Sequence, residues 1–247
     1  DPTTPVFKHP DNWTDNPYNR YMRSYNNQVW NPAATLDRPV GHSRNYGVLL
    51  NPYLQIKPVE GLVLRTQFGV NASVVRTDSY APIFSLDALE QSTTSSVTRR
   101  MYENVDWNWT NTANYSISIA EKHNINAMVG FTAERFGYWN VQAKREGIPN
   151  DEDTLREVDA GTGEQYANGD TSYYTLVSWL GRVMYNFNQR YYITASVRVD
   201  GSSRFGDGNK YATFPAVSGA WRISEEPFMK DVDIIDNLKI RAGWGKV

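Results

Sequence analysis

The sequence contains no cysteine among its 247 residues. Disulfide bridges, thiolate zinc sites and a cysteine nucleophile are therefore excluded by counting alone. A chain without thiols is also compatible with an oxidising compartment, where free cysteines would be at risk of oxidation.

The chain also lacks long apolar runs and an excess of charge of either sign. No stretch approaches the roughly 18 uninterrupted apolar residues of a membrane helix, so if the chain crosses a bilayer it does so with strands. The 25 Lys and Arg residues balance 27 Asp and Glu, which leaves no basic field to attract nucleic acid. The mean hydropathy of −0.59 combined with 13% aromatic residues fits both a soluble β-sandwich and a membrane β-barrel.

Catalytic and metal-binding patterns are missing as well. His9, His42 and His123 are far apart in the sequence, and no pair has the spacing of helical metal ligands. Nothing places the acidic groups at 151–153 and 225–226 across a cleft, so we interpret them as solvated loop acids. The Gly-rich loop at 200–209 matches neither a phosphate-binding loop nor an EF-hand and indicates a turn-rich connection. We therefore predict no enzymatic activity, no catalytic residue, no metal site and no cofactor.

Alternation of apolar and polar residues is the clearest feature that is present. In 191–200, Ile193, Ala195 and Val197 alternate with Thr194, Ser196 and Arg198, which predicts a strand with two unlike faces. Its length of about 10 residues suits a tilted strand that crosses the hydrocarbon core. The same pattern occurs clearly in two further ranges, 62–74 and 124–133, as well as in 175–187. Weaker matches occur in 46–57, 105–117, 214–224 and 237–246, so the sequence predicts about eight strands.

The connections between the predicted strands alternate in length. Ranges 57–61, 118–123 and 188–190 are tight, whereas 77–100, 137–172 and 201–211 are long and polar. Tyr185, Phe187 and Tyr191 flank one tight turn, as expected for rings at a membrane surface, although ordinary core or edge packing would also explain them. We predict an all-β fold, an antiparallel transmembrane β-barrel segment with short periplasmic turns and long extracellular loops.

Several runs in the C-terminal part carry a family resemblance. The runs Ser178–Phe187 and Tyr191–Gly206 resemble the barrel signature of SusC/RagA-type TonB-dependent outer-membrane transporters, and Phe214–Glu226 and Asn237–Gly245 continue it in order and spacing. The similarity is specific over roughly residues 173 to 247 and fainter upstream, at 51–62 and 122–130.

This resemblance implies that residues 1–247 are part of one barrel domain of about 22 strands. The plug, the N-terminal TonB-contacting segment and the C-terminal strands would lie outside this chain. It further implies a bacterial outer-membrane active importer of glycans or peptides, energised through TonB and capped by a SusD-like lipoprotein. A soluble carbohydrate-binding β-sandwich and a passive porin remain the alternatives.

Candidate solute contacts follow from the predicted lumen face and loops. The alternation places five arginines on the polar, lumen-facing side of the predicted strands: Arg65, Arg182, Arg198, Arg222 and Arg241. On the other side they would be buried in lipid, which would be costly. They either steer a solute or pair with acids of the wall or plug. Loop aromatics either stack on a sugar ring, dock the lid protein or pack within their loops. The predicted substrate-binding residues are Trp30, Trp139, Arg182, Arg198, Asp200 and Arg204.

Overall fold

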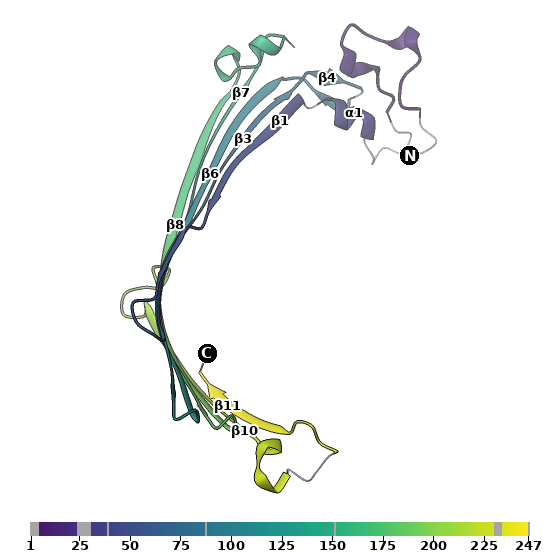
Figure 1. Ribbon diagram of the computed structural model, residues 1–247. Coiled ribbons are helices and arrows are strands. Elements are labelled where there is room, and N and C mark those ends of the chain that lie inside the picture. The colour runs from purple at the N-terminus through teal and green to yellow at the C-terminus, as the bar shows by residue number, and fades with distance from the viewer. Residues whose placement is uncertain are drawn as a thin grey trace. The chain divides into compact units, whose positions relative to one another are not determined.

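The computed structural model describes residues 5–23, 31–38, 40–86, 88–150, 152–229 and 234–246 (Figure 1). Within these ranges, no helix has both the length and the apolar character needed to cross a membrane. Trp30 and Asp151 lie outside the described residues, so the prediction for Trp30 stays untested.

Strands make up most of the described chain, and the helical elements are short. The helical elements are η1 (Pro10–Asn12), η2 (Pro17–Arg20), α1 (Pro32–Asp37), η3 (Asp153–Leu155), η4 (Val158–Ala160), η5 (Ile223–Glu225) and η6 (Pro227–Met229). The strands are β1 (Val40–Leu50), β2 (Tyr53–Ile56), β3 (Leu62–Ala81), β4 (Phe84–Ser85), β5 (Gln91–Ser92), β6 (Ser96–Ile119), β7 (His123–Glu146), β8 (Gln165–Phe187), β9 (Tyr191–Ser202), β10 (Tyr211–Arg222) and β11 (Lys239–Gly245).

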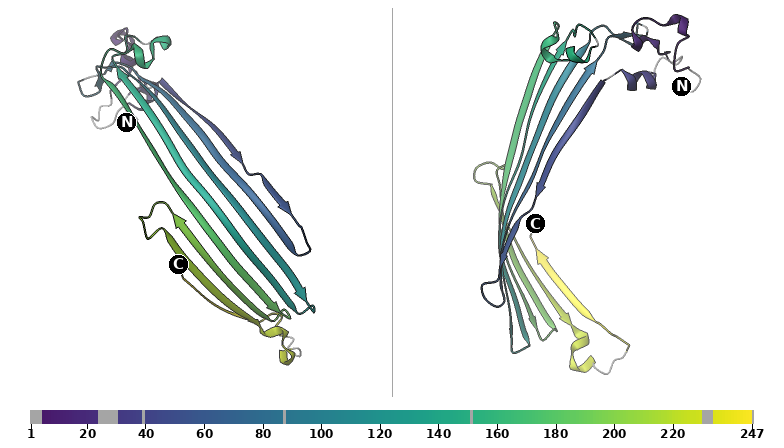
Figure 2. Two further views of the ribbon diagram at one scale, coloured as in Figure 1. Left: turned by 90° about the vertical axis from the view of Figure 1, so that its left-hand side faces the viewer. Right: turned by 45° about the horizontal axis from the view of Figure 1, so that its top comes forward.

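The long strands form one sheet in sequence order, β1-β3-β6-β7-β8-β9-β10-β11, with β2 also paired to β3 (Figure 2). Short β4 and β5 form a separate pair. The pairings β2–β3, β8–β9, β9–β10 and β10–β11 are antiparallel. A meander in which each strand pairs with the next confirms the predicted antiparallel fold class.

Several strands are longer than their apolar alternation predicts. β7 continues to Glu146 and β8 begins at Gln165, so much of the predicted loop at 137–172 is strand. The added part of β8 is exposed from Gln165 to Tyr173. A strand with water on both sides needs no apolar face, so it carries no period-two signal. The bounds of this predicted loop are therefore corrected from 137–172 to 147–164, and it remains much longer than the turn at 188–190.

The first predicted strand, 46–57, is interrupted by Asn51 and Pro52. Proline has no backbone N–H to donate to a ladder, and here its carbonyl accepts from the Phe68 N–H at 3.0 Å. The turn at 188–190 matches its prediction. Asn188 and Gln189 both have positive φ, at 48° and 55°, and Arg190 N donates to Phe187 O at 3.0 Å. Positive φ at two successive residues is the backbone of a type I′ turn, whose twist suits the flanking strands, and here it lies within the three-residue connection 188–190.

The chain divides into two compact units, and several strands contribute residues to both. The first unit consists of Asp1–Gly47, Ser73–Asn104 and Tyr138–Ser172. The second consists of Val48–Ala72, Val105–Gly137 and Tyr173–Val247. We refer to them below as the first and the second unit.

The first unit has a small conventional core. Tyr80, Val97 and Ile148 are buried, and Val158 of η4 packs against them. Arg38, which follows α1, forms a buried ion pair with Glu90 at 3.0 Å and lies over the Phe84 ring at 3.8 Å. These contacts fix α1 and the β4–β5 loop to each other within the unit.

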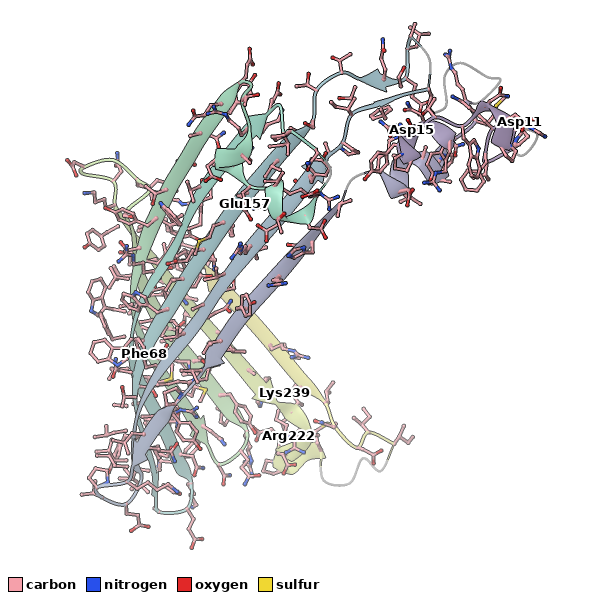
Figure 3. The ribbon with its side chains drawn as sticks, turned by 90° about the horizontal axis from the view of Figure 1, so that it is seen from above. Asp11, Asp15, Phe68, Glu157, Arg222 and Lys239 are labelled. Carbon is pink, nitrogen blue, oxygen red and sulfur yellow. The ribbon has the colours of Figure 1, made fainter. Side chains whose placement is uncertain are left out.

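A charge cluster lies beside this core. Asp78 is paired with Arg76, Arg99 and His42 at 3.2–3.3 Å, and Arg99 also reaches Glu157, which is labelled in Figure 3. At the N-terminal end of the unit, the Tyr21 hydroxyl donates to the Asp37 carboxylate. Burial, followed by this hydrogen bond and the carboxylate's charge, raises the pKa of Tyr21 to about 12.

Candidate functional site on the two-faced sheet

Strand register gives the second unit one apolar face. Across β8 and β9, Trp179 pairs with Val199, Val183 with Ala195 and Tyr185 with Ile193. The row continues as Ala195 with Val217 in β10 and Val217 with Trp244 in β11. Because opposite residues of neighbouring strands point to the same side of a sheet, these side chains form one continuous surface, which we call the apolar face.

The apolar face is exposed. Val183, Ile193, Val217 and Trp244 are 48%, 53%, 47% and 64% exposed, respectively. A soluble protein of this size buries such rows, and a contiguous exposed apolar surface marks an interaction site or a lipid contact. In the described ranges the long strands form one sheet, so the buried layer between two sheets that a β-sandwich requires is not observed.

The opposite face is polar and carries the arginines. Arg182 pairs with Ser196, and Arg198 with Leu180 and Phe214. At the other end of the face, Arg222 of β10 and Lys239 of β11, both labelled in Figure 3, are register partners. Arg241 also falls on this side, opposite Ala220. The predicted placement of these arginines away from the apolar side chains agrees with the register.

A row of rings lies at the edge of the sheet where β7 and β9 begin and β8 and β10 end. His123 contacts Phe187 at 4.9 Å between ring centroids, Phe187 contacts Tyr191 at 6.2 Å, and Tyr191 contacts Trp221 at 6.4 Å. Glu226 accepts from Tyr191 Oη at 2.6 Å and Trp221 Nε1 at 3.0 Å. These two hydrogen bonds, aided by the charge of a nearby arginine, lower the pKa of Glu226. A row of amphipathic rings at one strand end is what the membrane surface favours.

Two of the predicted solute-contact residues form a pair on the polar face. Arg198 Nε donates to the Asp200 carboxylate at 2.6 Å, and the Arg198 guanidinium also donates to Ser178 Oγ at 3.2 Å. The Arg198 side chain is 54% exposed and the Asp200 side chain 35%. The pair therefore remains accessible to a solute that offers hydroxyl or amide groups.

Arg204 lies in a second arrangement, in the β9–β10 loop. Its guanidinium is 3.8 Å from the centre of the Tyr174 ring, which stacks on Phe136 at 4.8 Å and 17°. The sequence pattern could not reveal this stack, because it joins β7, β8 and the loop. A cation over a ring adds roughly 0.5–2 kcal/mol of attraction, so Tyr174 holds Arg204 over the strands.

The remaining predicted residues are not brought into these contacts. The Nε atom of Arg182 is buried and has no hydrogen-bond partner among the described residues. Trp139 belongs to the first unit and is 42% exposed. Its neighbour Tyr138 stacks on Tyr102 at 5.7 Å and donates to Asp170 at 2.7 Å, so alternation directs Trp139 to the opposite side of β7.

The exposed apolar face, the polar arginine-bearing face and the antiparallel meander together define a segment of a transmembrane β-barrel wall. No family model matches the sequence. Several individual proteins are nevertheless similar to the sequence. The chain is 27% identical over 246 residues to the TonB-dependent receptor P26 of Formosa agariphila, which covers 99% of this chain and 24% of the receptor. It is 44% identical over 100 residues to the TonB-dependent receptor SusC of Bacteroides thetaiotaomicron, which covers 40% of this chain and 10% of SusC.

Solved structures agree with these sequence matches. A chain of the RagAB peptide transporter superposes with a TM-score of 0.80 at 26% identity, over 91% of this chain and 25% of that chain. A chain of the RagAB peptide importer in its 'open-open' state superposes with a TM-score of 0.80 at 27% identity. In sequence and fold the chain is thus similar to a barrel segment of SusC/RagA-type TonB-dependent transporters, and it spans about a quarter or less of the length of these relatives. The relatives are named as receptors and transporters rather than enzymes, as the sequence predicted.

Proposed function

We propose that this chain forms wall and extracellular loops of an active importer in the bacterial outer membrane that takes up glycans or peptides. The importer is energised through TonB and capped by a SusD-like lipoprotein. Residues 1–247 belong to one barrel domain of this importer, and its plug, TonB-contacting segment and C-terminal strands are supplied by parts of the protein outside this chain.

The exposed apolar face in register across β8 to β11 supports this proposal most strongly. Outward apolar side chains require hydrocarbon, whereas inward arginines require a wet lumen. A passive porin would share both faces. The likeness to proteins named as TonB-dependent receptors favours an energised importer over the porin.

Solute contacts on the polar face are assigned to Arg182, Arg198, Asp200 and Arg204. The Arg198–Asp200 pair offers a donor and an acceptor side by side, a combination that suits both hydroxyl groups and peptide amides. Trp139, on the extended part of β7, and Trp30 would stack on a solute or contact the lipoprotein cap.

Uptake by whole cells tests the proposal. Cells that carry the full-length protein should accumulate labelled oligosaccharides or short peptides, and deletion of the gene, deletion of tonB or addition of a protonophore should each abolish the uptake. Uptake that survives loss of TonB would instead indicate a passive pore. A protein recovered folded and monomeric in buffer without detergent would contradict the membrane location.

A further inference from the structure

The second unit carries a second row of rings on its apolar face. The first ring row is the one at the strand ends, formed by His123, Phe187, Tyr191 and Trp221. The second ring row is formed by Phe68, labelled in Figure 3, and by Trp107, Trp109, Phe131, Trp179 and Tyr211. Rings in contact within it have their centroids 5.8–6.2 Å apart. Trp179 pairs with Val199 on the apolar face, which places the row there.

The spacing of the two ring rows matches the height of a hydrocarbon layer. On β7 the rows are marked by His123 and Phe131, and on β8 by Phe187 and Trp179, eight positions apart in both cases. A strand with a rise of about 3.3 Å per residue and a tilt of about 40° advances roughly 2.5 Å per residue along the membrane normal. The rows are therefore about 20 Å apart, close to the apolar band of about 25 Å that aromatic girdles flank in membrane barrels.

Arg135 lies just beyond the second ring row, on the same outward side. It follows Phe131 by four positions on β7, so alternation gives both side chains the same face. The advance per residue places it roughly 10 Å farther out than Phe131. Headgroups add about 5–7 Å to each side of the hydrocarbon core, and a long arginine side chain can bend into that layer.

The contacts of Arg135 leave its guanidinium available to a ligand. The residue is exposed, and its guanidinium lies 5.0 Å from the centre of the Tyr173 ring. It forms no ion pair with any residue that the structure describes. A planar fork of N–H donors fits the oxygens of a phosphate group, which is the anion that lipid headgroups offer at this height.

A hollow of about 510 Å³ begins at the second ring row and extends toward the first. Its apolar lining includes Ile56, Leu64, Val129, Phe131 and Trp179. The Trp109 indole donates to Thr66 Oγ1 at 2.9 Å, which places this part of β3 on the apolar face, and Ile56 pairs with Leu64. An empty space would forfeit dispersion contacts, so a hollow open to hydrocarbon is filled by an acyl chain.

Asn111 adds a polar group at the mouth of this hollow. It lines the hollow and lies two positions from Trp109 on β6, so it shares the apolar face at the height of the second ring row. An amide is costly inside hydrocarbon. At the hydrocarbon surface it can instead bond the ester or amide that joins an acyl chain to its headgroup.

We infer that Arg135, Tyr173 and the hollow, together called the lipid groove, bind a phosphorylated lipid of the outer leaflet. Its phosphate lies at Arg135 and one of its acyl chains lies in the hollow. The outer leaflet is assigned because the first ring row adjoins the tight turns, which are periplasmic in such barrels. The inference rests on the proposed outer-membrane location and goes beyond solute import, because this ligand stays in the membrane.

Native mass spectrometry of the full-length protein in detergent tests this inference. The probes are lipid A, enzymatically dephosphorylated lipid A and phosphatidylglycerol. The unmodified protein should bind lipid A about tenfold more tightly than the dephosphorylated form, because a charge-assisted contact is lost without the phosphate. Arg135→Gln should abolish this difference, and Arg135→Lys should retain most of it.

Two further variants separate the parts of the groove. Arg241→Gln is the matched control, because it removes the same charge from an exposed arginine on the polar face of the same unit, and it should leave lipid binding unchanged. Ala113→Phe places a ring into the hollow, which Ala113 lines, and should weaken both forms of lipid A to the same degree. The heat-dependent shift on gels shows whether each variant is folded.

The outcomes separate this inference from the proposed function. Equal affinity of the unmodified protein for the two forms of lipid A would overturn the lipid groove, even if a variant failed to fold. Tighter binding of phosphatidylglycerol than of lipid A, or undiminished lipid A binding by Arg135→Gln, would also overturn it. TonB-dependent uptake should be unchanged in Arg135→Gln cells. Uptake by unmodified cells that survives loss of TonB would refute the proposed function and leave the lipid groove standing.

Discussion

Ile193 in the second unit is 53% exposed, whereas Ile148 in the first unit is 4% exposed. Isoleucine thus faces outward at position 193 of the second unit and inward at position 148 of the first. The first unit follows the rule of soluble proteins, with a small apolar core and paired charges around it. The second unit reverses the rule along β8 to β11, because its apolar side chains face a hydrocarbon solvent. Exposure of apolar residues therefore has a different physical meaning in the two units.

The largest effect is expected at the buried Arg38–Glu90 pair of the first unit. Arg38→Ala should cost about 3–5 kcal/mol, because it leaves the Glu90 carboxylate buried without its cation. Hydrogen exchange in α1 and the β4–β5 loop should report this loss. Lys210→Ala is the control, since its ion pair with Asp207 in the second unit is exposed and should contribute less than about 1 kcal/mol. Equal effects would remove the distinction between the two pairs.

Charge placed on either side of β9 should sharpen the contrast within the second unit. Val197→Arg should cost roughly 2–4 kcal/mol near the bilayer midplane, whereas Thr194→Arg on the polar face should cost much less. Refolding titrations of the full-length barrel into lipid vesicles measure both changes. If Thr194→Arg proves as costly as Val197→Arg, the assignment of the two faces is wrong.

Truncation in the small core should act locally. Ile148→Ala should cost about 2 kcal/mol, through lost burial and the cavity left against Tyr80 and Val97. Protease sensitivity should rise around residues 147–164, while heat-dependent unfolding of the barrel on gels stays unchanged. Ile193→Ala in the second unit should leave both readouts close to wild type, because lipid refills the space that the removed side chain occupied. Global unfolding of the Ile148→Ala protein would argue against a separate local core.

The smallest effect concerns Tyr21. Its folded-state pKa of about 12 exceeds the unfolded value of about 10. A raised pKa stabilises the fold fully below pH 10, and this contribution is lost as pH rises through about 12. The ultraviolet absorbance of tyrosinate, compared between wild type and Tyr21→Phe, should reveal one late-titrating group. Its absence from the difference spectrum would contradict the contact with Asp37.

The sequence predicted the second unit better than the first because the bilayer imposes a strict pattern. Strand β9 was expected at 191–200 and is found at Tyr191–Ser202, and Arg182 and Arg198 lie on the predicted face. In the first unit, by contrast, the part of β8 from Gln165 to Ser172 is exposed throughout and shows no apolar alternation. The core of the first unit depends on Ile148 and Val158, which lie in the segment between β7 and β8. Residues outside strands show no apolar–polar alternation, so the sequence pattern did not predict this core.

The candidate site was predicted only in part, for a related reason. Alternation assigns a residue to a face but gives no register between distant strands. The stack of Arg204, Tyr174 and Phe136 combines residues from two strands and a loop.

Site-directed spin labelling tests the two-faced wall most directly. This chain has no cysteine of its own, so single labels at Val197→Cys and Ser196→Cys can be compared in a full-length parent freed of other cysteines and reconstituted in lipid. The label at 197 should collide more often with oxygen, which concentrates in the hydrocarbon core, and the label at 196 with a water-soluble nickel chelate. Equal access of both labels to the nickel chelate would contradict the membrane-facing assignment of the apolar face.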